Sequence, residues 1–113
     1  MTFRLDEHLH NRMDKMKQVR IYTLKDSQSA EIYFHIHWPR HRVSLSAFDI
    51  YVNDVYLGEN CQVIATVTYQ EGADIQAINQ KYMSSEAFMS DMKSFDMSSI
   101  LRVDEITIKE TLF

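Results

Sequence analysis

Residues 62–70, QVIATVTYQ, decide the fold because their side chains alternate regularly along the stretch. In an extended chain, successive side chains point to opposite faces of a sheet. One face then carries Val63, Ala65, Val67 and Tyr69, and the other carries Gln62, Ile64, Thr66 and Thr68. β-branched residues at a period of two suit a pleated surface. The stretch predicts a β-strand, the clearest one in the chain.

Three further stretches predict the other strands of a sheet. Residues 48–57 alternate in the same way and precede a turn at Gly58–Asn60, so they and residues 62–70 predict an antiparallel hairpin. Residues 18–25 predict the first strand, with apolar side chains on both of its faces. Residues 100–108 predict the last strand. The phase of its alternation changes at Asp104–Glu105, where we expect a β-bulge.

Helices are predicted between these strands. The side chain of Asp26 or Ser27 can accept from the free amides of a first helical turn. That helix should be kinked or interrupted at Trp38–Pro39, because proline disfavours the helical conformation of the residue before it. Asp74 is the predicted cap of a second helix, which restarts at Ser84 or Ser85 and continues to about residue 95.

The predicted order is strand, helix, strand, strand, helix, strand. This order indicates an α+β, ferredoxin-like domain in which a four-stranded antiparallel sheet has both helices on one face. We place this domain at residues 18–113 and interpret residues 1–17 as an N-terminal arm or short helix. Because the second face of the sheet also carries apolar residues, it needs a cover, and we expect a homodimer.

Composition limits the partners and the compartment. The chain has 113 residues and a formal net charge of −4, so nucleic acid is not the expected partner. No apolar run approaches the length of a membrane span, and we expect no membrane insertion. The single cysteine, Cys61, cannot form an internal disulfide, which favours a cytoplasmic location. We interpret Cys61 as structural, because no neighbour that would lower its pKa is evident.

Several short motifs resemble members of the NIPSNAP family, within the dimeric α+β barrel superfamily. They are RIYTL at 20–24, HWPRH at 37–41 with Ser44, Leu45 and Phe48, EGAD at 71–74, and YMSS at 82–85 with Phe88, Asp91, Met92, Phe95 and Asp96. The resemblance covers residues 18–109. It implies a homodimer of ferredoxin-like subunits, each with a cavity between sheet and helices. It implies no single reaction, because the superfamily includes cofactor-independent monooxygenases, polyketide cyclases, isomerases and haem-binding enzymes.

His37 and His41 are the candidate catalytic residues, as a general acid or base. Their spacing of four would also suit a metal, but Pro39 lies between them and no third ligand stands out, so we expect no metal. The commoner role for such rings is to cap the broken helix, to fill the subunit interface or to face solvent. Arg40 is the candidate for holding an anionic group of a ligand, although pairing with surface carboxylates is the commoner role for such a residue.

Aromatic residues on the predicted sheet and helices are the candidates for binding a small molecule. Core packing is the commoner role for such residues, but a buried tyrosine must find a partner for its hydroxyl and can present it to a ligand. The candidates are Tyr22, Trp38, Tyr69 and Tyr82. No phosphate-binding loop or dinucleotide fingerprint is present in the sequence, and we expect no cofactor.

The sequence thus favours a cytoplasmic homodimer that binds a small apolar or aromatic metabolite. Proton-transfer chemistry on that molecule (isomerisation, cyclisation or cofactor-independent oxygenation) would need positioning and one titrating group. One alternative is a non-catalytic ligand carrier or dimerising partner protein. Another is a haem-dependent enzyme of the same superfamily.

Overall fold

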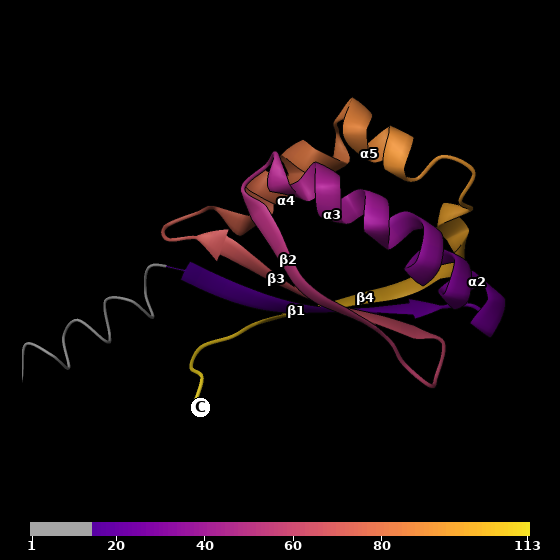
Figure 1. Ribbon diagram of the computed structural model, residues 1–113, viewed down its shortest axis with the longest axis horizontal. Helices are drawn as coiled ribbons and strands as arrows, with labels where there is room; N and C mark the ends of the chain where they lie inside the picture. Colours follow the sequence, from indigo (N-terminus) through magenta and orange to yellow (C-terminus); the bar gives the residue numbers. More distant parts are fainter. Residues whose placement is uncertain (1–14) are drawn as a thin grey trace, which may run out of the picture.

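The computed structural model describes residues 15–113. Its strands form one antiparallel sheet of four strands in the order β2-β3-β1-β4. The helices lie on one side of this sheet (Figure 1). The predicted α+β, ferredoxin-like arrangement is confirmed. The strands are β1 (Lys15–Leu24), β2 (Ile50–Leu57), β3 (Gln62–Gln70) and β4 (Ile100–Thr107).

β2 begins at Ile50, two residues later than expected, and β1 and β4 also differ from prediction. β1 begins at Lys15, inside the segment expected to be an arm; the rest of that prediction, residues 1–14, lies outside the described residues. The bulge expected at Asp104–Glu105 is wrong, because both residues pair regularly with β1. The irregularity instead lies where Leu24 pairs with Ile100, at the start of β4. The phase change arises because Val103 and Ile106 lie on opposite faces of the sheet.

The first helical region is continuous but irregular. It consists of α2 (Ser27–Ile32), a π-helical turn η1 (Tyr33–His37) and α3 (Trp38–Ser46). Asp26 caps α2, accepting from the Ser29 amide at 2.7 Å. The interruption expected at Trp38–Pro39 falls in the turn just before it, where the Trp38 amide donates to the Tyr33 carbonyl. Pro39 therefore sits in the first turn of α3, where its missing N–H group is not needed.

The second helical region is shorter than expected. It consists of α4 (Ile75–Met83) and α5 (Glu86–Asp91), and the 3-10 turn η2 (Met97–Ser99) leads into β4. The predicted cap at Asp74 is confirmed, since its side chain accepts from the Ala77 amide, and of the two serines expected at the restart it is Ser85 that accepts from the Phe88 amide. The helix expected to reach residue 95 ends at Asp91. No helix of residues 15–113 is long and apolar enough to cross a membrane.

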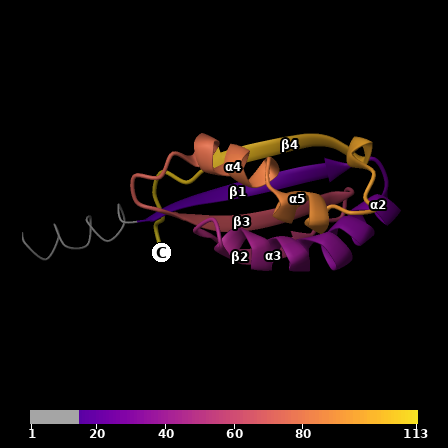
Figure 2. The same cartoon turned by 90° about the horizontal axis from the view of Figure 1, so that it is seen from above.

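The two faces of the sheet have different surroundings. The covered face is the one beneath the helices; in Figure 2 α3 runs alongside β2, while α4 lies toward β1 and β4. Its core residues are buried and include Leu24, Ile50, Val63, Val67 and Tyr69. The opposite face, here called the open face, has no helix over it among residues 15–113, and the segment after β4 borders one end of it. It carries half-buried Val19, Ile21 and Ile64 and the more exposed Tyr56 and Ile106.

Candidate functional site

A cavity of about 370 Å³ lies between the covered face and the helices. Tyr22, Val103 and Glu105 line it from the sheet, and the π-helical turn and α3 contribute Tyr33, Trp38 and His41. The remaining lining residues come mainly from α4, α5 and the segment that follows, and most of them are apolar. They are Arg20, Leu45, Asn79, Tyr82, Met83, Phe88, Met92, Met97 and Ile100.

A hydrogen-bonded chain of three residues lies at the helical side of this cavity. The Nδ1 atom of His41 is 2.6 Å from the Tyr82 hydroxyl. That hydroxyl donates to Oδ2 of Asp91 at 2.5 Å. All three residues are buried, and Ser44 donates to the other carboxylate oxygen of Asp91 at 3.0 Å. The helices α3, α4 and α5 thus each support one part of the chain.

The direction of these bonds fixes the tautomer of His41. Because the Tyr82 hydroxyl gives its proton to Asp91, its oxygen accepts from His41 Nδ1–H, and Nε2 carries the free lone pair. No hydrogen bond joins Nε2 to a described residue. Burial lowers the pKa of His41 to about 4, against the opposing effect of the Asp91 carboxylate. His41 is therefore neutral near pH 7 and can act as a base.

Burial also affects the tyrosines around this chain. It raises the pKa of Tyr82, and the hydrogen bond to Asp91 acts in the same direction. Burial likewise raises the pKa of Tyr22 and Tyr33, which lie edge-to-face with ring centroids 5.3 Å apart. All three hydroxyls therefore remain protonated near neutral pH, and the proton of Tyr82 is the one donated to Asp91.

A buried arginine lies at the sheet side of the cavity. Arg20 projects from β1 onto the covered face and is 8% exposed. Its Nε donates to Gln18 at 3.1 Å, and its Nη2 donates to Asn79 at 2.5 Å and to the Tyr69 hydroxyl. Its Nη1 makes only a long contact of 3.5 Å with the Tyr22 hydroxyl. These partners are all neutral.

The structure brings some of the predicted site residues together and separates others. His41, Tyr22, Trp38 and Tyr82 line the cavity. Tyr69 does not line it, but its hydroxyl is hydrogen-bonded to Arg20 and Asn79, which do.

His37 does not line the cavity. Its Nδ1–H donates to the Asp91 carbonyl at 2.7 Å, and its ring packs edge-to-face on Phe95. Arg40 is exposed and makes a 3.4 Å contact with the same carbonyl. The placement favours structural roles for His37 and Arg40, and it leaves His41 as the candidate base.

Arg20, Asn79 and Asp91 were not singled out as site residues from the sequence. Arg20 has a signal that could have identified it: it shares the strand phase of Tyr22 and Leu24, and an arginine in a buried phase is unusual. Asp91 and Asn79 lie on helices among other polar residues, so the sequence holds no comparable signal for them.

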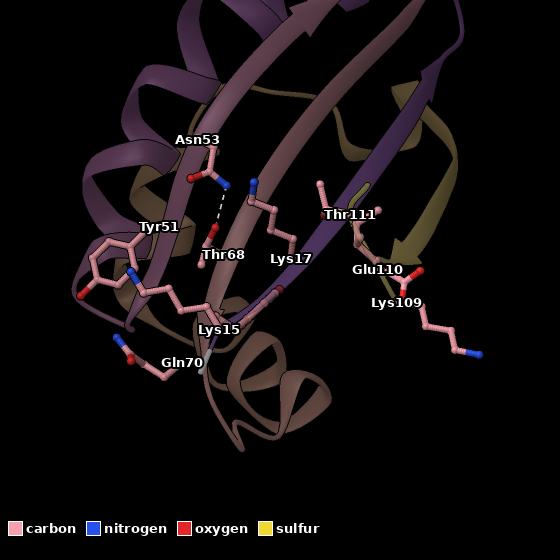
Figure 3. Close-up of a pocket in the computed structure, with 11 residues that line it drawn as sticks. Lys15, Lys17, Tyr51, Asn53, Thr68, Gln70, Lys109, Glu110 and Thr111 are labelled. Carbon is pink, nitrogen blue, oxygen red and sulfur yellow. Dashed lines mark hydrogen bonds between the residues drawn. The ribbon is translucent and has the colours of Figure 1, made fainter. Parts of the chain in front are cut away.

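A second hollow, of about 650 Å³, lies on the open face near the start of β1. Figure 3 shows Lys15 and Lys17 extending over it, close to a hydrogen bond between Asn53 and Thr68. It is lined mainly by polar residues and holds neither a histidine nor a hydrogen-bonded relay. No group of three or more histidine, cysteine or acidic residues within 15–113 is placed to hold a metal ion.

Comparisons with known proteins identify the fold. No family model matches the chain, and no curated protein matches it. The chain is similar to a NIPSNAP family protein with unknown function from Agrobacterium tumefaciens (TM-score 0.70, 12% identity, covering 89% of this chain and 92% of that one). A second NIPSNAP family protein from that organism has TM-score 0.67 and 15% identity, covering 88% and 95%.

The similarity extends to another member of the same fold group. A candidate antibiotic biosynthesis monooxygenase from Caulobacter crescentus has TM-score 0.53 and 10% identity, covering 93% of this chain and 99% of that one. At such identities the similarity concerns the fold alone. The chain therefore has a NIPSNAP-like, ferredoxin-like fold, as its sequence motifs predict.

Proposed function

We propose that this protein binds a small, largely apolar molecule in the cavity beneath its helices and transfers a proton to and from it. The single observation that carries the proposal is the chain from His41 through Tyr82 to Asp91, whose first two members line a mostly apolar cavity. A perturbed titratable group in such a cavity is the usual form of an acid–base site. Isomerisation, cyclisation and cofactor-independent oxygenation all begin with such a transfer.

The geometry supports a simple first step. A C–H bond next to a carbonyl group gives its proton to Nε2 of His41, and the bonding electron pair moves into the carbonyl to form an enolate. The new positive charge on the imidazole is stabilised through Tyr82 by the Asp91 carboxylate, whose Oδ2 lies 3.6 Å from Nδ1. Return of the proton to the same or another carbon completes the exchange or isomerisation.

The test uses 2-tetralone, a flat bicyclic ketone with exchangeable protons next to its carbonyl group. Uptake of deuterium from D₂O is followed by proton NMR with and without protein. We expect the protein to accelerate exchange about 100-fold or more over buffer, because positioned general bases contribute at least that much. His41→Gln should return the rate to that of buffer.

The matched control is His35→Gln, because His35 is exposed on the same helical region and lies outside the cavity. This variant should exchange like the wild type. If the wild type binds 2-tetralone but does not accelerate exchange, His41 is not a base and the non-catalytic carrier becomes the better hypothesis. Equal loss in His35→Gln and His41→Gln would also contradict the proposal.

We further propose that a second copy of the chain covers the open face. Val19 lies beside Ile106, and Ile64 lies between Ile21 and Tyr56, so these side chains form one continuous apolar strip across the strands. Such a strip on the surface favours burial.

Charge supports pairing of two copies. Lys15 and Lys17 stand at one end of the open face, whereas Asp54 and Asp104 lie farther along it. A two-fold mate can therefore set unlike charges opposite one another. Native mass spectrometry of the purified protein would report the subunit number and any bound small molecule together. A cytoplasmic location agrees with the single cysteine and stays a proposal.

A further inference from the structure

Arg20 is a buried cation without a negative partner among residues 15–113. Its hydrogen-bond partners are the neutral side chains of Gln18, Tyr22, Tyr69 and Asn79, and no described carboxylate lies within ion-pairing distance of it. A buried charge is expensive unless it is paired. Its Nη1 is also the least satisfied part of the group, because its single contact, with Tyr22, is long. Tyr22 lies on the sheet and also packs edge-to-face on Tyr33 and Trp38, which line the cavity.

A second donor, on a residue that lines the same cavity, has no partner among residues 15–113. The indole Nε1 of Trp38 is enclosed and makes no hydrogen bond with any described residue. Trp38 is 2% exposed, lines the cavity, and packs edge-to-face on Tyr22 with ring centroids 5.7 Å apart. Buried N–H groups are almost always paired in folded proteins, so an unpaired one on a residue that lines a cavity indicates a missing acceptor.

We propose that the ligand of this cavity is an organic anion, a flat apolar molecule whose carboxylate accepts hydrogen bonds from Arg20 and Trp38. The inference rests on the proposed function and names its substrate class. A carboxylate is acceptor-only and can take two donors at once, which matches a guanidinium edge and an indole N–H. The rest of the cavity is mostly apolar and aromatic, and suits a carbon skeleton rather than a second charge.

Glu105 is the competing partner for Arg20 within the chain. It pairs with Arg20 across β1 and β4 and lines the same cavity, yet it is exposed and makes no ion pair with Arg20. If Glu105 swings inward in solution, it would neutralise the arginine and exclude an anion. The experiment therefore includes Glu105→Gln.

The probes are 2-naphthoate and 2-naphthamide, which have nearly the same shape but differ in charge. Trp38 is the single tryptophan of the chain, so its fluorescence and its indole NMR signal report on the cavity directly. We expect the wild type to bind naphthoate at least about tenfold more tightly than naphthamide, because a buried hydrogen-bonded charge pair is worth that much. Naphthoate should also move the indole N–H signal, because Nε1 gains an acceptor. This comparison needs no variant and stands even if Arg20 substitutions unfold.

Variants test which residue causes the preference for naphthoate over naphthamide. Arg20→Gln should remove it by weakening naphthoate binding about tenfold or more while leaving naphthamide within a few-fold. Lys17→Gln is the matched control, because Lys17 is a cation of the open-face hollow, and it should keep the preference. If Lys17→Gln abolishes the preference and Arg20→Gln does not, the anion binds the open face and the inference is overturned.

The outcomes separate this inference from the proposed function. If both probes bind the wild type equally well, the cavity is a binding site but the anion preference is overturned. If they bind equally and naphthoate gains about tenfold in Glu105→Gln, then Glu105 is the partner of Arg20 and the inference is again overturned. If neither probe perturbs Trp38, the cavity does not bind small molecules and the proposed function fails with it.

Discussion

The two faces of the sheet are built from the same four strands, yet they end in different environments. On β3, Val63 and Val67 are buried beneath the helices, whereas Ile64, between them in sequence, remains half-buried on the open face. Between the covered face and its helices lie buried polar groups, namely Arg20 on the sheet and the His41 chain on the helices. The open face mixes aliphatic residues with threonines and lysines. Alternation therefore defines two surfaces, and what covers each surface determines its chemistry.

The largest expected effect comes from truncating the same residue type on each face. Ile50 is fully buried on the covered face, and Ile50→Ala should lower the free energy of unfolding by about 2–5 kcal/mol. Ile64→Ala on the open face should cost only about 1 kcal/mol at low protein concentration. Urea unfolding at several protein concentrations measures both. Equal losses at the lowest concentration would mean that the two faces are equally covered within one chain.

The dependence of the free energy of unfolding on pH tests whether burial beneath the helices lowers the pKa of His41. Its folded pKa of about 4 lies below the ordinary 6.5, so the unfolded state binds a proton that the folded state does not. Stability should therefore fall as the pH falls from 6.5 towards 4, and His41 should have no effect above about pH 7. Relative to His41→Gln, the wild type should lose roughly 2–3 kcal/mol more between pH 7 and pH 4. Parallel curves for the two proteins would contradict this burial.

Placing a charge on the open face tests whether a second copy covers it. Ile64→Lys should raise the dimer dissociation constant about 30-fold or more while the monomer stays folded, because the charge would be buried at the centre of the apolar strip. Sedimentation velocity over a range of concentrations measures this. Val43→Lys is the control, since Val43 is exposed on the outside of α3 and should leave association unchanged. A wild type that sediments as a monomer at micromolar concentration would contradict the proposed dimer.

The smallest expected effect comes from the N-terminal cap of α4. Asp74 accepts from the Ala77 amide at 3.1 Å and starts α4, which carries Tyr82 to the cavity. Asp74→Ala should cost about 1 kcal/mol in the free energy of unfolding. Asp74→Asn keeps an accepting oxygen and should retain most of the stability. Thermal unfolding of the three proteins gives the comparison. An Asp74→Ala variant as stable as the wild type would show that the cap does not stabilise α4.

Most of the fold could be predicted from the sequence because the signals are local. The alternation of residues 62–70 and the caps at Asp26, Asp74 and Ser85 depend on a few neighbouring residues, and the structure has them where they were expected. The position of the helix irregularity was predicted to within one turn, because proline acts on the residues just before it.

The candidate site could be predicted only in part because it depends on distant contacts. His41 acquires its tautomer from Tyr82 and Asp91, which are 41 and 50 residues later in the chain. His37 and His41 look equivalent in sequence, and only packing of α5 separates the ring that lines the cavity from the ring that is bonded to the Asp91 carbonyl. The two arginines differ for the same reason. The sequence favoured Arg40, but Arg20 is the buried one, because burial depends on how the sheet and the helices pack together.

The π-helical turn at Tyr33–His37 acts as a one-residue insertion within a long helix. Because the wide turn takes up this residue locally, deleting one residue there would restore regular α-helical spacing without rotating α2 against α3. The sheet and both helices would persist, and Tyr33 and His41 would then be about seven positions apart, a spacing that keeps both side chains on one face of an α-helix. A chain of this fold that is one residue shorter at this position would therefore keep both the architecture and the tyrosine ring beside its histidine.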